Sequence, residues 1–281
     1  MKSTLSILTA LAALFFMISC DDEAPSPYTE QIVVDGFLYV GSPLQVKLAH
    51  TVPFDQAYYP DSVRVTGAEV RVVVEGDTFA LTEENSGIPG TYSAPADSHL
   101  VQSGKTYYLM IMNSGYPDLT ATCVAAPDLH LIGGYRVTRD NSDIIVETNP
   151  DTIEYGGDYL RLDWNEDPTV FAYALLIENL ETEKYGEDCD IGDDNGPGSY
   201  VSLWTYRFGY SLEIGEVGYC YTGRYQIRVF SCDFDSWNYF NTTVPQDFEN
   251  RPVTNLSSGM GIFCAVGCDT FSFALTDSME N

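Results

Sequence analysis

Short alternating segments separated by turns are the feature that most constrains the fold of this chain. Within residues 68–76, Val70, Val72 and Val74 share one parity, so their side chains fall on one face of an extended strand. Similar segments cover residues 31–41, 43–52, 77–83, 90–95, 105–113 and 119–125, and turn-forming residues such as Gly and Pro separate them. Seven short strands in about 100 residues predict a small β-sandwich of the immunoglobulin or transthyretin type over residues 29–126.

The second half of the chain has the same character. Leu160, Leu162 and Trp164 share one face of a strand, and a later segment, 223–233, alternates Tyr225, Ile227 and Val229. This arrangement resembles a fibronectin type III sandwich. The segment 235–248 breaks the alternation and predicts a short helical insertion before a last strand at 269–275. We therefore expect an all-β protein with two sandwich domains, the second over residues 127–281.

The N-terminus predicts where the protein is located in the cell. Residues 1–19 carry one charge, Lys2, before a short apolar run, as secretory signal peptides do. The sequence from Met17 to Cys20 resembles a bacterial lipobox, in which the cysteine becomes the first mature residue and carries lipid. The acidic residues 21–23 resemble the surface-export signal of Bacteroidota lipoproteins. We expect Cys20 to be lipidated, residues 20–28 to form a tether, and the protein to face the exterior from the outer membrane.

Charge narrows the list of partners. The chain has a net charge of −28, and removal of residues 1–19 takes away Lys2 and no acid, which leaves −29. Nucleic acid is excluded, because binding it requires a basic face. The expected partners are the membrane, through the lipid, and an outer-membrane transporter, a surface glycan or another protein.

The cysteines predict disulfides. Six cysteines besides Cys20 would lie in an oxidising compartment, where at least two bridges are expected. Sequence does not choose among the 15 pairings, although Cys264 and Cys268 are close enough in the chain to be a candidate pair. Only Cys123 lies in the first domain. Either one bridge joins the domains, therefore, or at least two thiols are free.

The order of motifs along the chain carries a family resemblance. After the lipobox come "VVDGFLYVGSPLQVKLAHT", "GAEVRVVVEGDTFAL", "GTYSA", "GKTYYLMI", "LDW" and "NLSSGMGIFCAVG". In this order the chain resembles a Bacteroidota lipoprotein family known as domain of unknown function 4249. The resemblance implies an outer-membrane lipoprotein, often found alongside outer-membrane transporters. It implies no known activity and supplies no catalytic residues.

The densest acidic segment is a candidate calcium site. Its carboxylates belong to Glu187, Asp188, Asp190, Asp193 and Asp194, and hard oxygen ligands of this kind suit Ca²⁺. The spacing does not follow an EF-hand loop. A solvated loop without metal is the alternative interpretation.

An aromatic alternation follows directly. Tyr200, Trp204, Tyr206, Phe208 and Tyr210 all have even numbers, so a strand would place them on one face. Two interpretations are open. The face is either the aromatic inner side of a sheet or a platform on which a sugar or aromatic ligand stacks, since Tyr and Trp offer a flat apolar ring with a polar handle.

No motif predicts catalysis. The histidines His50, His99 and His130 are isolated, and the sequence contains neither a nucleophile elbow nor a phosphate-binding loop. We expect a non-catalytic surface lipoprotein that acts as a binding or accessory module, in particular for an outer-membrane nutrient transporter. The alternative is an adhesin or matrix protein that binds another protein, for which the aromatic loop at 51–63 is a candidate tip.

Overall fold

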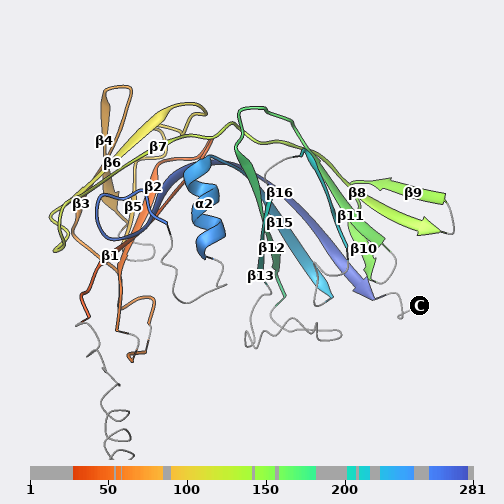
Figure 1. The fold of residues 1–281 in the computed structure, drawn as a ribbon, viewed down its shortest axis with the longest axis horizontal. Helices are drawn as coiled ribbons and strands as arrows, with labels where there is room; N and C mark the ends of the chain where they lie inside the picture. Colours follow the sequence, from red (N-terminus) through yellow and green to blue (C-terminus); the bar gives the residue numbers. More distant parts are fainter. Residues whose placement is uncertain are drawn as a thin grey trace, which may run out of the picture.

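The structure, a computed structural model, describes residues 28–53, 55–57, 59–84, 90–140, 143–155, 158–181, 201–206, 209–215, 222–243 and 253–277. In these residues the chain forms strands β1 to β16 and the helix α2 (Figure 1). The expectation of an all-β protein with sandwich architecture and a short helix is confirmed.

The seven strands expected in the first sandwich are all present. They are β1 (Ile32–Tyr39), β2 (Gln45–His50), β3 (Glu69–Val74), β4 (Asp77–Glu83), β5 (Thr91–Ser93), β6 (Thr106–Met112) and β7 (Leu119–Val124). They follow the order β1-β2-β5-β4-β3-β6-β7 and wrap around one core. Val70, Val72 and Val74 are buried in that core, as their parity predicts.

The second sandwich has two layers. Its strands are β8 (Leu131–Asp140), β9 (Asp143–Thr148), β10 (Thr152–Tyr155), β11 (Asp158–Trp164), β12 (Ala172–Asn179), β13 (Val201–Tyr206), β14 (Ser211–Ile214), β15 (Gly223–Cys232) and β16 (Met260–Asp277). One layer has the order β13-β12-β15-β16, with β10 beyond β16, and the other is a four-stranded sheet, β14-β11-β8-β9. The predicted inward residues of 160–164 and 225–229 are buried between the layers.

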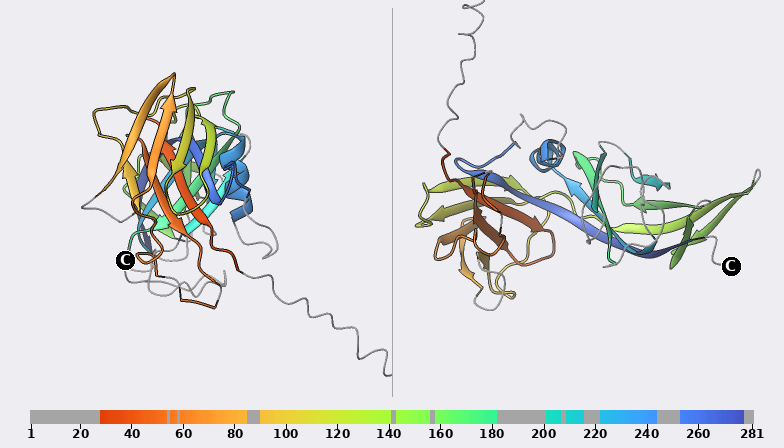
Figure 2. Two further views of the ribbon diagram at one scale, coloured as in Figure 1. Left: turned by 90° about the vertical axis from the view of Figure 1, so that its left-hand side faces the viewer. Right: turned by 90° about the horizontal axis from the view of Figure 1, so that it is seen from below.

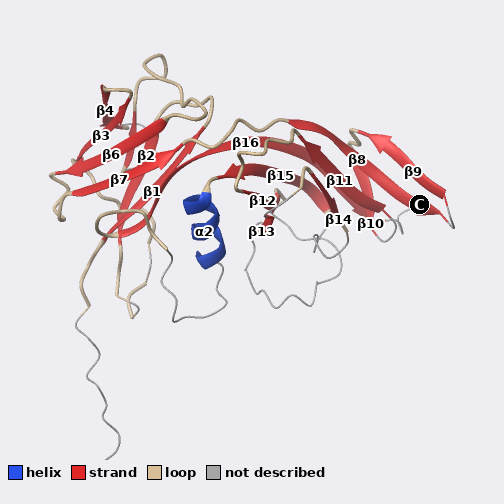
Figure 3. Ribbon diagram, turned by 45° about the horizontal axis from the view of Figure 1, so that its top comes forward, coloured by secondary structure: helices blue, strands red, loops and turns tan. Residues whose placement is uncertain are grey.

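Strand β16 belongs to both sandwiches. Residues 260–266 pair in parallel with β1, and residues 267–275 pair antiparallel with β15. Figures 2 and 3 show it as one continuous curved strand that runs from the first sandwich into the second. The sequence predicted only residues 269–275 as a strand. The first sandwich therefore includes residues 260–266 from the C-terminal end of the chain.

Glycines allow β16 to approach β1. Gly261 has φ +99°, and a Cβ there would lie 2.0 Å from the carbonyl oxygen of Val34. On the facing strand, a Cβ at Gly36 would lie 2.9 Å from the carbonyl oxygen of Ile262. Side chains at these positions would block the parallel pairing.

The two faces of β16 have different coverings. The odd-numbered Phe263 belongs to the first core, and Phe273 to the second. The even-numbered Ile262, Cys264 and Val266 pack instead with residues of helix α2 (Phe234–Thr243). The helix therefore covers the opposite face of the shared sheet, below the place where the sandwiches meet (Figure 1).

Helix α2 has a clear start and an aromatic contact surface. The carboxylate of Asp233 accepts hydrogen bonds from the backbone N–H of Ser236 at 2.8 Å and from its hydroxyl at 2.5 Å, which is an N-cap. Phe240 stacks on Phe37 of β1 with ring centroids 5.4 Å apart and also lies 6.2 Å from Phe230 of β15. The helix thus contacts strands from both sandwiches.

The expectation of at least two disulfides is wrong. Cys123, Cys232, Cys264 and Cys268 are free thiols, so at most one pair remains among the six cysteines. Cys264 and Cys268 lie four residues apart on extended β16, which separates their Cα atoms by about 13 Å. A disulfide needs about 4.4–6.8 Å. Cys189 and Cys220 lie outside the described residues.

Candidate functional site

Several predicted site residues lie outside the described residues. These are the lipid-attachment residue Cys20 and the whole candidate calcium segment, Glu187, Asp188, Asp190, Asp193 and Asp194. Tyr200 and Phe208 of the aromatic alternation also lie outside them. The calcium site therefore stays a prediction.

The rest of the aromatic alternation is divided between two elements. Strand β13 ends at Tyr206, and Gly209 has φ +115°, so Tyr210 precedes β14 instead of extending β13. Tyr210 is 51% exposed. In the β12–β13 register Trp204 lies opposite Leu175, and Tyr206 lies opposite Tyr173. Both partners belong to the second core.

The histidines do not converge on one site. His50 lies 3.0 Å from the Thr51 carbonyl oxygen, and the Nε2 atom of His99 lies 3.2 Å from the Tyr107 hydroxyl. His130 pairs with Asp128 at 3.2 Å. Among the residues that the structure describes, no group of three or more His, Cys, Asp or Glu side chains is placed to hold a metal ion.

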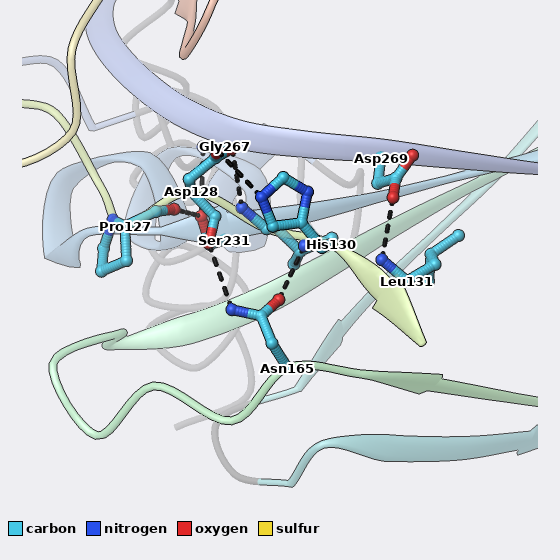
Figure 4. Close-up of polar contacts among 9 residues, drawn as sticks. Pro127, Asp128, His130, Leu131, Asn165, Ser231, Gly267 and Asp269 are labelled. Atoms are coloured by element: carbon cyan, nitrogen blue, oxygen red, sulfur yellow. Dashed lines mark hydrogen bonds and ion pairs between the residues drawn. The ribbon is translucent and has the colours of Figure 1, made fainter. Parts of the chain in front are cut away.

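A polar cluster fixes the junction between the sandwiches (Figure 4). The Ser231 hydroxyl donates to the Pro127 carbonyl oxygen at 2.5 Å and accepts the Gly267 N–H at 3.1 Å. One serine thus ties the linker to both β15 and β16. Gly267 is required here, because a Cβ would lie 2.4 Å from the Pro127 oxygen.

The linker is held at further points. The N–H of Ala126 donates to the carbonyl oxygen of Ala265 at 2.9 Å. The N–H of Leu131 donates to the carboxylate of Asp269 at 2.8 Å, and the N–H of His130 donates to the Asn165 side chain at 2.6 Å. With the shared strand, these bonds join the two sandwiches into one frame.

A pocket of about 330 Å³ lies beside this junction. Its lining includes the carboxylates of Asp167 and Asp233. Hydrogen bonds from the hydroxyl and N–H of Thr169 lower the pKa of Asp167, and Asp233 caps α2. Both carboxylates thus have structural partners in their own loops, which accounts for their positions.

The strongest candidate for binding is the outer face of the four-stranded sheet. Its register places Glu213, Arg161 and Tyr135 in one row across β14, β11 and β8, and places Ser211 beside Asp163 in the next. We define the tyrosine face by six residues: Tyr135, Tyr159, Arg161, Asp163, Ser211 and Glu213. The alternate residues of these strands, such as Leu160, Leu162 and Ile214, fill the core.

Two tyrosine rings on this face lean over glycines. A Cβ at Gly133 would lie 3.1 Å from the hydroxyl of Tyr135, and a Cβ at Gly215 would lie 3.2 Å from the ring of Tyr159. Side chains on strands usually stand perpendicular to the sheet. The missing glycine side chains leave room for these rings to lie low on the surface.

An ion pair lies beside the tyrosines, with Arg161 opposite Tyr135. Arg161 donates two hydrogen bonds to Asp163, at 2.8 and 3.1 Å, in the bidentate geometry that guanidinium groups favour. Burial raises the pKa of Asp163, but donors on Arg161 and Ser211 outweigh it and hold the pKa below its ordinary value. The Arg161 side chain is 42% exposed.

This face is partly exposed. Glu213 is exposed and the other five residues are half-buried. Val137, which lies opposite Tyr159 on the same face, is 5% exposed. Two rings and an ion pair on the surface of a sheet are groups that can bind a ligand. The sequence held a signal for it: the inward parity of residues 160, 162 and 164 leaves Tyr159, Arg161 and Asp163 facing outward.

The terminal motif "NLSSGMGIFCAVG" is structural. The side-chain amide of Asn255 donates to the carbonyl oxygens of Thr122 and Phe263 at 3.1 and 2.7 Å, and its oxygen accepts the Phe263 N–H. Ser257 exchanges two hydrogen bonds with the backbone of Thr120. The motif therefore closes the first sandwich by holding β7 beside β16.

Comparison with known proteins places the chain in a family. No helix within the described residues is long and apolar enough to cross a membrane. A search of curated proteins found no match. The family model "Domain of unknown function (DUF4249)" matches residues 20–270, which is most of the chain. The chain therefore belongs to the DUF4249 family.

Proposed function

We propose that this protein is a lipid-anchored, non-catalytic binding module on the outer face of the outer membrane, where it serves a nutrient transporter. The observation that carries the proposal is the tyrosine face, which lies on the outer side of its sheet, on a frame whose two sandwiches share one strand. A frame of two joined sandwiches with polar and aromatic groups on an outer face is suited to presenting a ligand.

One observation supports the location at the membrane. The lipobox-like motif ends at Cys20, and the family match begins at the same residue. Four free thiols, three of them buried, do not argue against an oxidising compartment, because burial protects a thiol from oxidants. The family is one of unknown function, so the role as a transporter accessory is our inference.

Protease treatment of intact cells tests whether the protein is located at the cell surface. The wild-type protein is expected in the outer-membrane fraction and should be cleaved without lysis. The variant Cys20→Ala should leave that fraction, because it lacks the acyl chains that anchor the protein. A wild-type protein that resists protease until the cells are lysed would contradict surface exposure.

A deletion strain tests the role. As an accessory to uptake, the protein should be needed for growth when the nutrient is scarce, and a plasmid copy should restore growth where a Cys20→Ala copy does not. Loss of surface attachment with unchanged growth would favour an adhesin instead. If neither property changed, both roles would be refuted.

A further inference from the structure

We propose that strand β9 is a docking edge, to which a partner protein adds an extended segment with alternating basic and β-branched apolar residues. Docking at this edge requires neither the lipid anchor nor the tyrosine face, so it goes beyond the proposed function.

Strand β9 lies at the edge of the four-stranded sheet, next to β8. The β8–β9 hairpin projects from the end of the second sandwich, away from α2 and from the first sandwich (Figures 1 and 2). Among the described elements, β8 is the only one with an extensive contact to β9. Val146 is 55% exposed, and Glu147, Thr148 and Asn149 are exposed as well. The far side of β9 is therefore accessible to another chain.

The backbone of β9 presents hydrogen-bonding groups at this edge. The N–H of Asn149 donates to the carbonyl oxygen of Gly134 on β8 at 2.6 Å, so these two residues form a hydrogen-bonded pair. Such pairs alternate with non-hydrogen-bonded pairs along an antiparallel ladder. In the β8–β9 register, the N–H and C=O groups that point away from β8 therefore belong to Ile144, Val146 and Thr148. Among the described residues, no backbone hydrogen bond joins these groups to another segment.

Strand β9 lacks the protection that sheet edges usually have. Lys, Pro, a bulge or a covering segment commonly blocks an edge strand. In the first sandwich, the side chains of Asn255 and Ser257 bond the backbone of the edge strand β7. Strand β9 contains neither Lys nor Pro, and its pairing with β8 has no bulge. A regular and uncovered edge is what an extended peptide needs for β-strand addition.

Charge and side-chain pattern determine which kind of strand fits. Residues 139–155 contain five acidic residues and one basic residue, so a basic segment is attracted. A second copy of the chain, with its net charge of −28, is repelled. Glu147, with a side chain that is 51% exposed, lies on one face of β9, and Val146 lies on the other. Lys or Arg opposite Glu147 and a β-branched residue opposite Val146 match these two faces.

A synthetic peptide tests the docking edge. The probe is a short peptide of alternating Lys and Val, and its binding to the purified full-length protein is measured by fluorescence anisotropy. A peptide of alternating Glu and Val is the charge control, and we expect only the Lys–Val peptide to bind saturably. Amide hydrogen exchange at Val146 and Thr148 should slow in the complex, because their N–H groups enter a new ladder. Exchange at Glu147 should change less, because its N–H already bonds β8.

Proline at position 146 separates edge pairing from general charge attraction. Val146→Pro removes an outward N–H and no bond to β8, a position at which edge strands tolerate proline. The variant should bind the Lys–Val peptide about tenfold more weakly or worse. The matched control Val146→Thr keeps the N–H and should bind as the wild type does. A version of the peptide that contains proline should also lose binding, and this result stays decisive if the protein variant does not fold.

The proposal would be overturned if the Lys–Val peptide did not bind, or if its proline version bound equally well. Equal binding by Val146→Pro, with circular dichroism showing it folded, would overturn it too. So would stronger binding of the Glu–Val peptide, or a dimer of the wild type that Val146→Pro abolishes, which would assign the edge to a second copy. Because the assays use purified protein, their failure leaves the membrane location and the growth phenotype to be judged separately.

Discussion

Replacing Ser231 with alanine should weaken the whole frame. The serine is 1% exposed. Its hydroxyl donates a hydrogen bond to the Pro127 carbonyl oxygen and accepts one from the Gly267 N–H. Alanine leaves the buried Gly267 N–H without a partner, which costs about 1–3 kcal/mol. The Pro127 oxygen is only partly buried, so water recovers part of its bond and the cost there is nearer 1 kcal/mol. The expected total is about 2–4 kcal/mol.

Calorimetry and urea unfolding measure this loss. For a chain of this size each kcal/mol lowers Tm by about 2–4 °C, so a fall of roughly 5–15 °C is expected. Both sandwiches should unfold in one transition, because the serine binds the linker to their shared strand. Ser272→Ala is the control, since Ser272 is an exposed residue of the same strand. A Ser231→Ala variant within 0.5 kcal/mol of wild type, or two separate transitions in the wild type, would refute the reasoning.

Three further predictions follow from the described residues and from the acidic segment. Thiol titration without reductant should find at least four free thiols after unfolding. Before unfolding, Cys268 should be the only one of the four described thiols that reacts, because the other three are buried. Its alkylation should be slow, because burial raises its pKa to about 11, and should accelerate as the pH rises towards that value. Gly261→Ala should prevent normal folding, because its Cβ would clash with Val34, whereas Gly41→Ala, at a similar φ with open space around it, should cost only about 1 kcal/mol in urea unfolding. If the segment 187–194 binds Ca²⁺, millimolar Ca²⁺ should raise Tm and an equal concentration of Mg²⁺ should not, and equal shifts with both ions would indicate screening alone.

Strand positions were predictable wherever one face of a strand meets solvent. The parity of Val70 to Val74 and of Leu160 to Trp164 identified their buried faces, because the period of two is visible when polar residues alternate with apolar ones. Residues 260–268 lack that pattern. Phe263 is buried in the first core, and Cys264 is buried beneath α2. The strand is therefore apolar on both faces, and its sequence pattern does not distinguish a strand from a helix.

The candidate binding face was harder to find from sequence. Tyr135, Arg161 and Glu213 lie on three strands and meet only through their register, which turns and long-range pairing decide. The aromatic residues at 200–210, by contrast, lie close together in the chain, so their alternation is visible in the sequence itself. The ring of Tyr135 can lean because the residue two positions before it is Gly133. This local pattern can be interpreted only when both residues are known to lie on the outer face of the sheet.

The pairing of β16 with β1 has a consequence for the order of folding. Their partner residues, such as Val33 and Met260, are more than 200 positions apart, and β16 is synthesised after every other described strand. The domain that is made first is therefore completed last. Contacts of such sequence separation form slowly, and until they form, the open edge of β1 stays available for wrong pairing. A chain of this design gains its native first domain only after nearly all of it has been synthesised, and any truncation before residue 260 leaves both sandwiches incomplete.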